Sequence, residues 1–140
     1  MNRITNTNKQ VAAAFLQAIE DGDATALEAL LAPSFHWWVA GWGDRTRAEL
    51  LGALSRTMAA FPSRRLTTIG VTAEGERVAV EAEGRFERPG LVYANTYHYL
   101  FILQDGRITS GREYFDTAVA RAAFGSPLPS PSQEGNHHEQ

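Results

Sequence analysis

The 140-residue sequence contains no cysteine, which excludes disulfide bonds, thiol nucleophiles and thiolate metal sites. No apolar run approaches the roughly 20 residues that a membrane-spanning helix requires. The first ten residues are polar and lack the apolar core of a signal peptide, so we expect a cytoplasmic protein without a membrane partner. The 13 Lys and Arg residues are scattered and the net charge is −3, so nothing indicates a nucleic-acid-binding surface.

Motifs for cofactors and metals are also missing from the sequence. The part expected to fold contains no HxH or HxxE pair, and no GxGxxG, P-loop or nucleophile-elbow pattern occurs. The triplet Gly41-Trp42-Gly43 neither opens a helix directly nor carries a lysine, so it is not a phosphate loop. We therefore expect no metal and no cofactor.

The remaining composition is that of an ordinary globular protein, with 44% hydrophobic and 21% charged residues. A chain of this length can bury a real core as one domain, which we place at residues 1–125. The following segment, 126–140, contains three prolines and three serines and has little to bury. We expect this tail to be disordered, so that its histidines cannot form a preorganised site.

Hydrophobic periodicity in the first half of the chain predicts three helices. Residues 6–21 form an amphipathic pattern, and a short second helix should follow it and end at Pro33. Thr46 and Glu49 form a capping-box pattern at the start of the third helix. This helix should stop at Pro62.

Other segments carry strand patterns. The aromatic run 35–39 is short and favours a strand, with a loop following it at 41–44. Residues 66–73 are a further strand candidate, and residues 78–83 alternate between apolar and acidic side chains, as a half-buried strand does.

The segment Ala94–Asp116 carries the strongest local prediction. Its Asp105-Gly106 pair lies between alternating apolar runs, which predicts two strands joined by a tight hairpin turn. Successive strand residues point to opposite faces. A carboxylate, an amide and two phenols could therefore line one wall of a mostly apolar cleft. The residues expected on this face are Asn95, Tyr97, Tyr99, Glu113 and Phe115.

Helices followed by an antiparallel meander predict the α+β class, with the helices packed on one face of a curved sheet. Such an arrangement leaves a conical space between the helices and the sheet. This space is where we expect a ligand to bind.

The order of the predicted helices and strands, together with three sequence stretches, resembles a known protein family. The helical stretch AIEDGDATALEALLAP, the glycine-rich loop after it and the ending DGRITSGREYFD resemble the SnoaL-like branch of the nuclear transport factor 2-like superfamily, over roughly residues 8–124. The resemblance implies a cone-shaped fold with three N-terminal helices on a curved, mainly antiparallel sheet and a short C-terminal helix. Such relatives include ketosteroid isomerases, limonene epoxide hydrolases, polyketide cyclases and non-catalytic association domains, so the likeness leaves the function open.

Functional positions of ketosteroid isomerases match this sequence poorly. Their tyrosine donor in the first helix corresponds to Phe15, and their general-base aspartate falls at or beside Val39. Their second oxyanion donor corresponds to His98 or Tyr99, depending on how the turn is aligned. The steroid-isomerase set is therefore mostly absent.

Limonene epoxide hydrolases resemble the chain closely at REYFD, where Glu113 matches one of their two aspartates. Their arginine and other aspartate fall at Val80 and Ala82, or, after a shift of one residue, at Glu81 and Glu83. Neither alignment supplies the arginine, so epoxide hydrolysis in that form is not expected.

Glu113 is the predicted catalytic residue. If it faces the cleft among aromatic rings, desolvation should raise its pKa toward the range useful for proton transfer at neutral pH. The alternative is a strand carboxylate paired with an arginine or a phenol, without a chemical role. The predicted substrate-binding residues, for which ordinary core packing is the alternative, are Trp37, Val39, Asn95, Tyr97, Tyr99 and Phe15.

His98, Glu81 and Glu83 are further possible site residues. His98 could act as a base near pH 7, but its parity in the strand sends it to the face opposite Tyr97. Cross-strand charge pairs with Arg112 would explain this group without chemistry.

The leading functional hypothesis is a cofactor-independent enzyme that binds a small apolar or polycyclic molecule and transfers a proton, as an isomerase, cyclase or dehydratase. The alternative is a non-catalytic ligand-binding or dimerisation module of the same fold. Because such relatives often pair through their sheet, and Leu100 and Ile102 make one sheet face aliphatic, we also expect a homodimer.

Overall fold

The computed structural model of the chain describes residues 3–124, so the predicted tail at 126–140 lies outside the described residues. Within them, four helices and six strands follow one another in the order and with the bounds given next. The elements are α1 (Arg3–Asp21), α2 (Ala24–Leu30), β1 (Leu31–Val39), β2 (Gly43–Thr46), α3 (Arg47–Ala60), β3 (Ser63–Glu74), β4 (Arg77–Arg88), β5 (Leu91–Gln104), β6 (Arg107–Phe115) and α4 (Thr117–Phe124).

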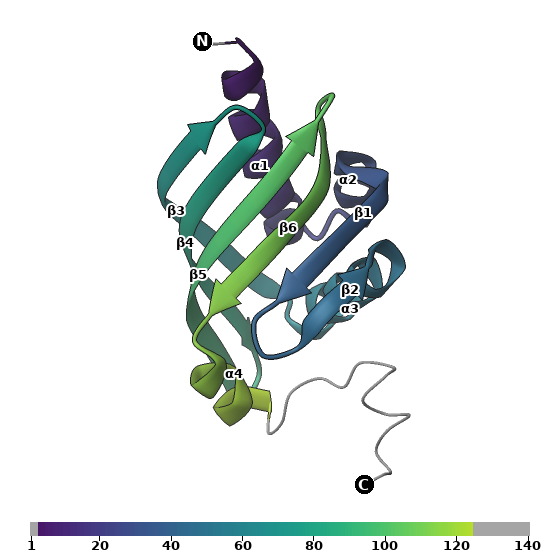
Figure 1. The fold of residues 1–140 in the computed structure, drawn as a ribbon. Coiled ribbons are helices and arrows are strands. Elements are labelled where there is room, and N and C mark those ends of the chain that lie inside the picture. Colours follow the sequence, from purple (N-terminus) through teal and green to yellow (C-terminus); the bar gives the residue numbers. More distant parts are fainter. Residues whose placement is uncertain (1–2, 125–140) are drawn as a thin grey trace, which may run out of the picture.

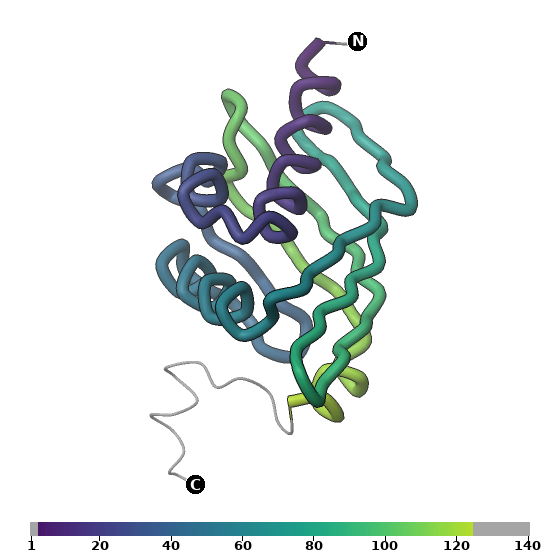
Figure 2. The backbone as a smooth tube through the Cα atoms, turned by 180° about the vertical axis from the view of Figure 1, so that it is seen from behind, coloured from purple at the N-terminus to yellow at the C-terminus, as the bar shows by residue number. Residues whose placement is uncertain are grey.

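The six strands form one sheet in the order β2-β1-β6-β5-β4-β3. The pair β1–β6 is parallel and the other neighbouring strands are antiparallel. Helices α1, α2 and α3 lie on one side of this sheet, in front of it in Figure 2, while its other face is turned to the viewer in Figure 1. This arrangement confirms the predicted α+β class and the cone-shaped architecture.

The first and third helices form for the local reasons that the sequence indicated. Helix α1 buries one face of its amphipathic pattern, which includes Phe15 and Ile19. At the start of α3, Thr46 Oγ1 accepts a hydrogen bond from the Glu49 backbone N–H (3.1 Å), and the Glu49 carboxylate accepts one from the Thr46 N–H (2.9 Å). The capping box is therefore present, and such a cap stabilises a helix by about 1 kcal/mol.

The boundary between α2 and β1 differs from the prediction. The second helix does not run to Pro33, because it ends at Leu30 and Leu31 already has extended backbone angles (φ −100°, ψ 133°). Pro33 lies inside β1, between Leu31 and His36, where the pairing with β6 is irregular. A proline fits such a place because no ladder hydrogen bond requires its missing N–H.

The predicted loop at 41–44 is also shorter than expected. Its second half, Gly43 and Asp44, belongs to β2, which pairs with the end of β1. Gly41 and Gly43 both have positive φ, at +83° and +86°, and glycine adopts these angles without steric cost.

The hairpin of β5 and β6 is confirmed. Asp105 and Gly106 connect the strands with φ of 51° and 78°, the combination that a two-residue turn of this kind requires. The register places Tyr99 opposite Glu113 and Tyr97 opposite Phe115. The predicted alternation of faces holds along β5 and from Ser110 to Phe115 of β6, whereas a bulge between Ile108 and Ser110 interrupts it near the turn.

The core lies between α1 and the inner face of the sheet. Phe15 from α1 stacks on Trp37 of β1, with ring centroids 5.5 Å apart, and meets Phe101 of β5 edge-on at 5.3 Å. All three side chains are fully buried. Along residues 3–124, no helix has both the length and the apolar character needed to cross a bilayer.

Candidate functional site

Glu113 lies in the middle of the sheet and points toward the helices. It stands in register with Tyr99 of β5 on one side and Val39 of β1 on the other. The indole Nε1 of Trp37 donates a hydrogen bond to Glu113 Oε1 at 3.0 Å. The three elements that place this carboxylate are therefore the consecutive strands β5 and β6 and the strand β1, which is far from them in the sequence.

The surroundings of Glu113 change its acidity. Burial raises the pKa of its carboxyl, and the hydrogen bond from Trp37 opposes part of this rise because it favours the charged form. Glu113 as a whole remains only half-buried, so solvent still reaches one side of it. A carboxyl in this state can take up and release a proton closer to neutral pH than an exposed glutamate can.

Two tyrosines of β5 lie beside this carboxylate. The rings of Tyr97 and Tyr99 stack with centroids 5.5 Å apart and nearly parallel planes. Burial raises the pKa of both hydroxyls well above the ordinary value, and the nearby charge of Glu113 adds to the effect. Both phenols therefore stay protonated and can donate hydrogen bonds.

The two phenols differ in their partners. The Tyr97 hydroxyl donates to the hydroxyl of Tyr93 at 3.5 Å. The Tyr99 hydroxyl has no hydrogen-bond partner in the described part of the chain. Tyr99 therefore presents a free donor next to Glu113.

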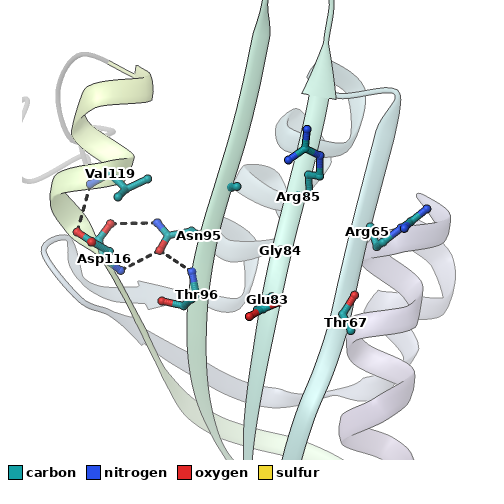
Figure 3. A pocket seen from close by; sticks show the side chains of 10 residues that line it. Arg65, Thr67, Glu83, Gly84, Arg85, Asn95, Thr96, Asp116 and Val119 are labelled. Carbon is teal, nitrogen blue, oxygen red and sulfur yellow. Dashed lines mark hydrogen bonds between the residues drawn. The ribbon is translucent and has the colours of Figure 1, made fainter.

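Asn95 uses its whole amide inside the protein (Figure 3). Its Nδ2 donates to the Tyr93 hydroxyl (2.7 Å) and to the Asp116 carbonyl (3.0 Å). Its Oδ1 accepts from the backbone N–H groups of Thr96 (2.8 Å) and Asp116 (3.0 Å). Because an amide has two N–H donors and two acceptor sites, no capacity remains for a ligand. Asn95 instead ties β5 to the junction between β6 and α4.

A partly exposed aromatic pair adjoins the carboxylate. The ring of Phe115 lies 5.8 Å from that of Tyr97 and 5.6 Å from that of Trp42. Phe115, Trp42 and Tyr97 are only half-buried, as are Glu113 and Val39. Trp37 and the aromatic rings of the core beyond it are inaccessible to solvent. We infer that a ligand would approach Glu113 from the side of Trp42 and Phe115.

Trp42 and Phe115 extend the predicted substrate-binding set. Phe115 shares the parity of Glu113, a signal that the alternation already contained. Trp42 sits on the loop between β1 and β2, whose path follows from Gly41 and Gly43, and its indole N–H is buried with no partner within residues 3–124.

The remaining predicted residues take two different positions. Phe15 and Trp37 belong to the closed core, with 1% and 0% of their surface exposed. His98, Glu81 and Glu83 are exposed on the outer face of the sheet, where His98 stands directly opposite Glu81. The register thus separates these three side chains from Glu113.

Two surface hollows lie elsewhere. The larger, of about 480 Å³, is on the outer face across β3, β4 and β5 beside α4 (Figure 3), and the smaller, of about 290 Å³, adjoins the first turns of α1. Neither is lined by Glu113. The outer hollow is lined by Arg65, Thr67, Glu83, Gly84, Arg85, Ala94, Asn95, Thr96, Asp116 and Val119.

In the region from residue 3 to residue 124, no three acidic or histidine side chains gather closely enough to hold a metal ion.

Comparison with known proteins gives a family and a fold. A family model described as a SnoaL-like domain matches residues 12–111. No curated protein matches the chain significantly.

Several solved structures superpose on most of the chain. An epoxide hydrolase of M. tuberculosis, described as similar to limonene epoxide hydrolase, has 22% identity and a TM-score of 0.74, with 87% of this chain and 92% of that one covered. IdmH of Streptomyces antibioticus, a proposed polyketide cyclase, has 24% identity and a TM-score of 0.71 over 84% and 98%. A protein of Catenulispora acidiphila with a ketosteroid isomerase-like fold has 23% identity and a TM-score of 0.72 over 84% and 94%. These likenesses establish the fold.

Proposed function

The chain belongs to the SnoaL-like domain family, and on this basis we propose that it is a cofactor-independent enzyme that transfers a proton on a small apolar molecule. The observation that carries the proposal is the state of Glu113. Its carboxyl faces aromatic rings, has a pKa raised by burial, and forms no ion pair with any residue between 3 and 124. These are the properties of a general acid–base group rather than of a structural ion pair.

The tyrosines support the same proposal. The free hydroxyl of Tyr99 lies on the strand position opposite Glu113. When a base removes a proton next to a carbonyl, negative charge develops on the carbonyl oxygen, and a neutral phenol can stabilise it by donating a hydrogen bond. Glu113 would move the proton and Tyr99 would stabilise the resulting charge.

The rings around the carboxylate define the substrate class. Tyr97, Phe115 and Trp42 offer flat apolar surfaces and bring no charged group of their own. A flat, uncharged and preferably polycyclic molecule fits this environment best. Isomerisation, cyclisation and dehydration are the reaction types proposed, because each removes a proton at one atom and returns one at another, which a single carboxyl can do.

A second candidate is a ligand-binding or dimerisation module without catalysis. The observation that favours it is the dense aromatic packing of Phe15, Trp37 and Phe101, which closes the inner end of the cone. The outer face of the sheet, which no helix of Figure 1 covers, would then be the functional surface.

Deuterium uptake by a ketone substrate distinguishes the enzyme from the non-catalytic module. We would incubate the protein in D₂O with a panel of bicyclic and polycyclic ketones and follow, by mass spectrometry, deuterium uptake at the carbon beside the carbonyl. The proposal predicts catalysed exchange that falls by about 100-fold or more in Glu113→Gln. Glu81→Gln, on the outer face of the same sheet, is the matched control and should retain full activity. Ketone binding without exchange would support the non-catalytic module.

A further inference from the structure

The indole of Trp37 lies directly over Gly111. The parallel pairing of β1 and β6 sets Trp37 beside Gly111 and Val39 beside Glu113. A Cβ atom added at position 111 would stand 2.3 Å from Trp37 Cζ3 and 2.6 Å from the carbonyl oxygen of Leu100. The second of these neighbours is backbone and cannot move aside cheaply. The absence of a side chain at Gly111 is therefore what lets the indole cross β6 and reach Glu113.

The ring has little freedom in this position. It stacks on Phe15 at 5.5 Å and on Phe35 at 5.6 Å, with interplanar angles of 27° and 21°, and none of its surface is exposed. A rotation that moved its N–H away from Glu113 would have to displace both neighbouring rings. Close-packed interiors resist such displacements.

The two oxygens of Glu113 therefore differ. Oε1 accepts the indole N–H at 3.0 Å. Oε2 has no hydrogen-bond partner in the described part of the chain. A carboxylate with one oxygen held by a buried donor has its plane and its free oxygen oriented before any ligand arrives.

We propose that Trp37, seated on Gly111, is a positioning residue for Glu113: its indole holds Oε1 and leaves Oε2 as the oxygen that exchanges the proton with a substrate. The assignment of Oε2 rests on the proposed proton-transfer function, whereas the hold on Oε1 does not. Trp37 thus acts through Glu113 rather than by contacting the substrate, since it is fully enclosed.

The other groups that face Glu113 do not provide this hold. Tyr99 stands opposite Glu113 on β5, and Tyr97 and Tyr93 lie earlier on the same strand. Burial raises the pKa of all three hydroxyls, so they are neutral phenols near neutral pH. No Lys, Arg or His among residues 3–124 forms an ion pair with Glu113. The indole N–H is therefore the contact that favours the charged carboxylate, and protonation of Glu113 should weaken this hydrogen bond.

The indole resonances provide a test that needs no substrate. In ¹H–¹⁵N spectra of the full chain recorded across a pH series, we expect the Trp37 indole signal to move with the titration of Glu113. In Glu113→Gln this movement should disappear. Trp38 is the matched control, because it lies on the same strand but packs on Arg112 and Tyr114, and its signal should not follow Glu113. A Trp37 signal that is insensitive to pH, or that titrates unchanged in Glu113→Gln, would overturn the proposal.

A substitution separates positioning from substrate contact. Trp37→Phe keeps an aromatic ring and removes the donor, so the pKa of Glu113, followed by the ¹³C signal of its carboxyl, should rise. With an active ketone substrate, the acid limb of kcat should move to higher pH, while KM changes less than about threefold. A large rise in KM with an unshifted pH profile would contradict positioning. If no ketone reacts with the wild type, the proposed function fails, but the pH titrations still decide whether Trp37 positions Glu113. If Trp37→Phe does not fold, the comparison of the wild-type spectra with those of Glu113→Gln decides it.

Discussion

Glu113 and Tyr99 stand directly opposite each other on β6 and β5, with both side chains on the inner face of the sheet. The negative charge of Glu113 contributes to the raised pKa of the Tyr99 hydroxyl, after burial as the main cause. The two groups are thus electrostatically coupled, and the coupling favours a charged carboxylate beside a neutral phenol. Changes at Glu113 should show in both stability and activity, whereas removal of the Tyr99 hydroxyl should show mainly in activity.

The pH dependence of stability should report Glu113. Because burial raises its pKa in the folded protein, the folded state holds the proton more tightly than the unfolded chain. The stabilisation is complete below the unfolded pKa of about 4.3 and is lost as the pH rises through the folded-state pKa. We expect Glu113→Gln to gain stability relative to wild type in urea unfolding at about pH 8, and little or none at about pH 4. An equal difference at both pH values would contradict this.

The free hydroxyl of Tyr99 should matter for activity and little for folding. Tyr99→Phe removes a donor with no partner inside residues 3–124, so unfolding should change by less than about 1 kcal/mol. Turnover should fall by about 10- to 100-fold if the phenol stabilises developing charge.

Tyr93→Phe is the matched comparison for Tyr99→Phe. The Tyr93 hydroxyl accepts the 2.7 Å hydrogen bond from Asn95, so its loss should destabilise the fold by about 1–3 kcal/mol. The same stability change in both variants would contradict the assignment of the free hydroxyl.

The close packing of the Trp37 indole on Gly111 can be tested by substitution of the glycine. Gly111→Ala forces an atom against the indole and the Leu100 carbonyl, and such overpacking typically costs about 1–3 kcal/mol. Gly52 is the matched control. It lies within α3, and a Cβ there would meet only the end of the Arg56 side chain at 3.4 Å. Gly52→Ala should therefore stabilise by up to about 1 kcal/mol, and equal effects of the two variants in urea unfolding would contradict the role of Gly111.

We propose that the outer sheet face pairs with a second copy of the chain. Leu100 and Ile102 of β5 lie there half-exposed, and no helix lies over the middle of this sheet face in Figure 1. Analytical ultracentrifugation should show a dimer that Ile102→Glu converts to monomers, because a charge cannot be buried unpaired in an apolar interface. Ile69→Glu, at an exposed apolar position on β3, should leave the dimer intact. A monomeric wild type would refute the pairing.

Features that depend on neighbours in the chain were predictable from the sequence. The β5–β6 turn needs only Asp105 and Gly106 to adopt positive φ, and the α3 cap involves two residues three positions apart. These two features arise from short-range hydrogen bonds and backbone sterics, which leave a local pattern in the sequence. The inward direction of Glu113 is different. Strict alternation counted from this turn would place Glu113 opposite His98 on the outer face, and a bulge between Ile108 and Ser110 places it opposite Tyr99 instead.

Other features depended on which strands meet. The early start of β1 at Leu31, the outward direction of Glu81 and the seat of Trp37 on Gly111 all follow from the register of neighbouring strands. The hydrogen bond between Trp37 and Glu113 joins residues 76 positions apart. No local pattern encodes such a contact, because it exists only after β1 has paired with β6 and the aromatic core has closed around the indole. The sequence alone determined the hairpin turn and the α3 cap, and the tertiary structure decided that Glu113 faces inward and that Trp37 holds it there.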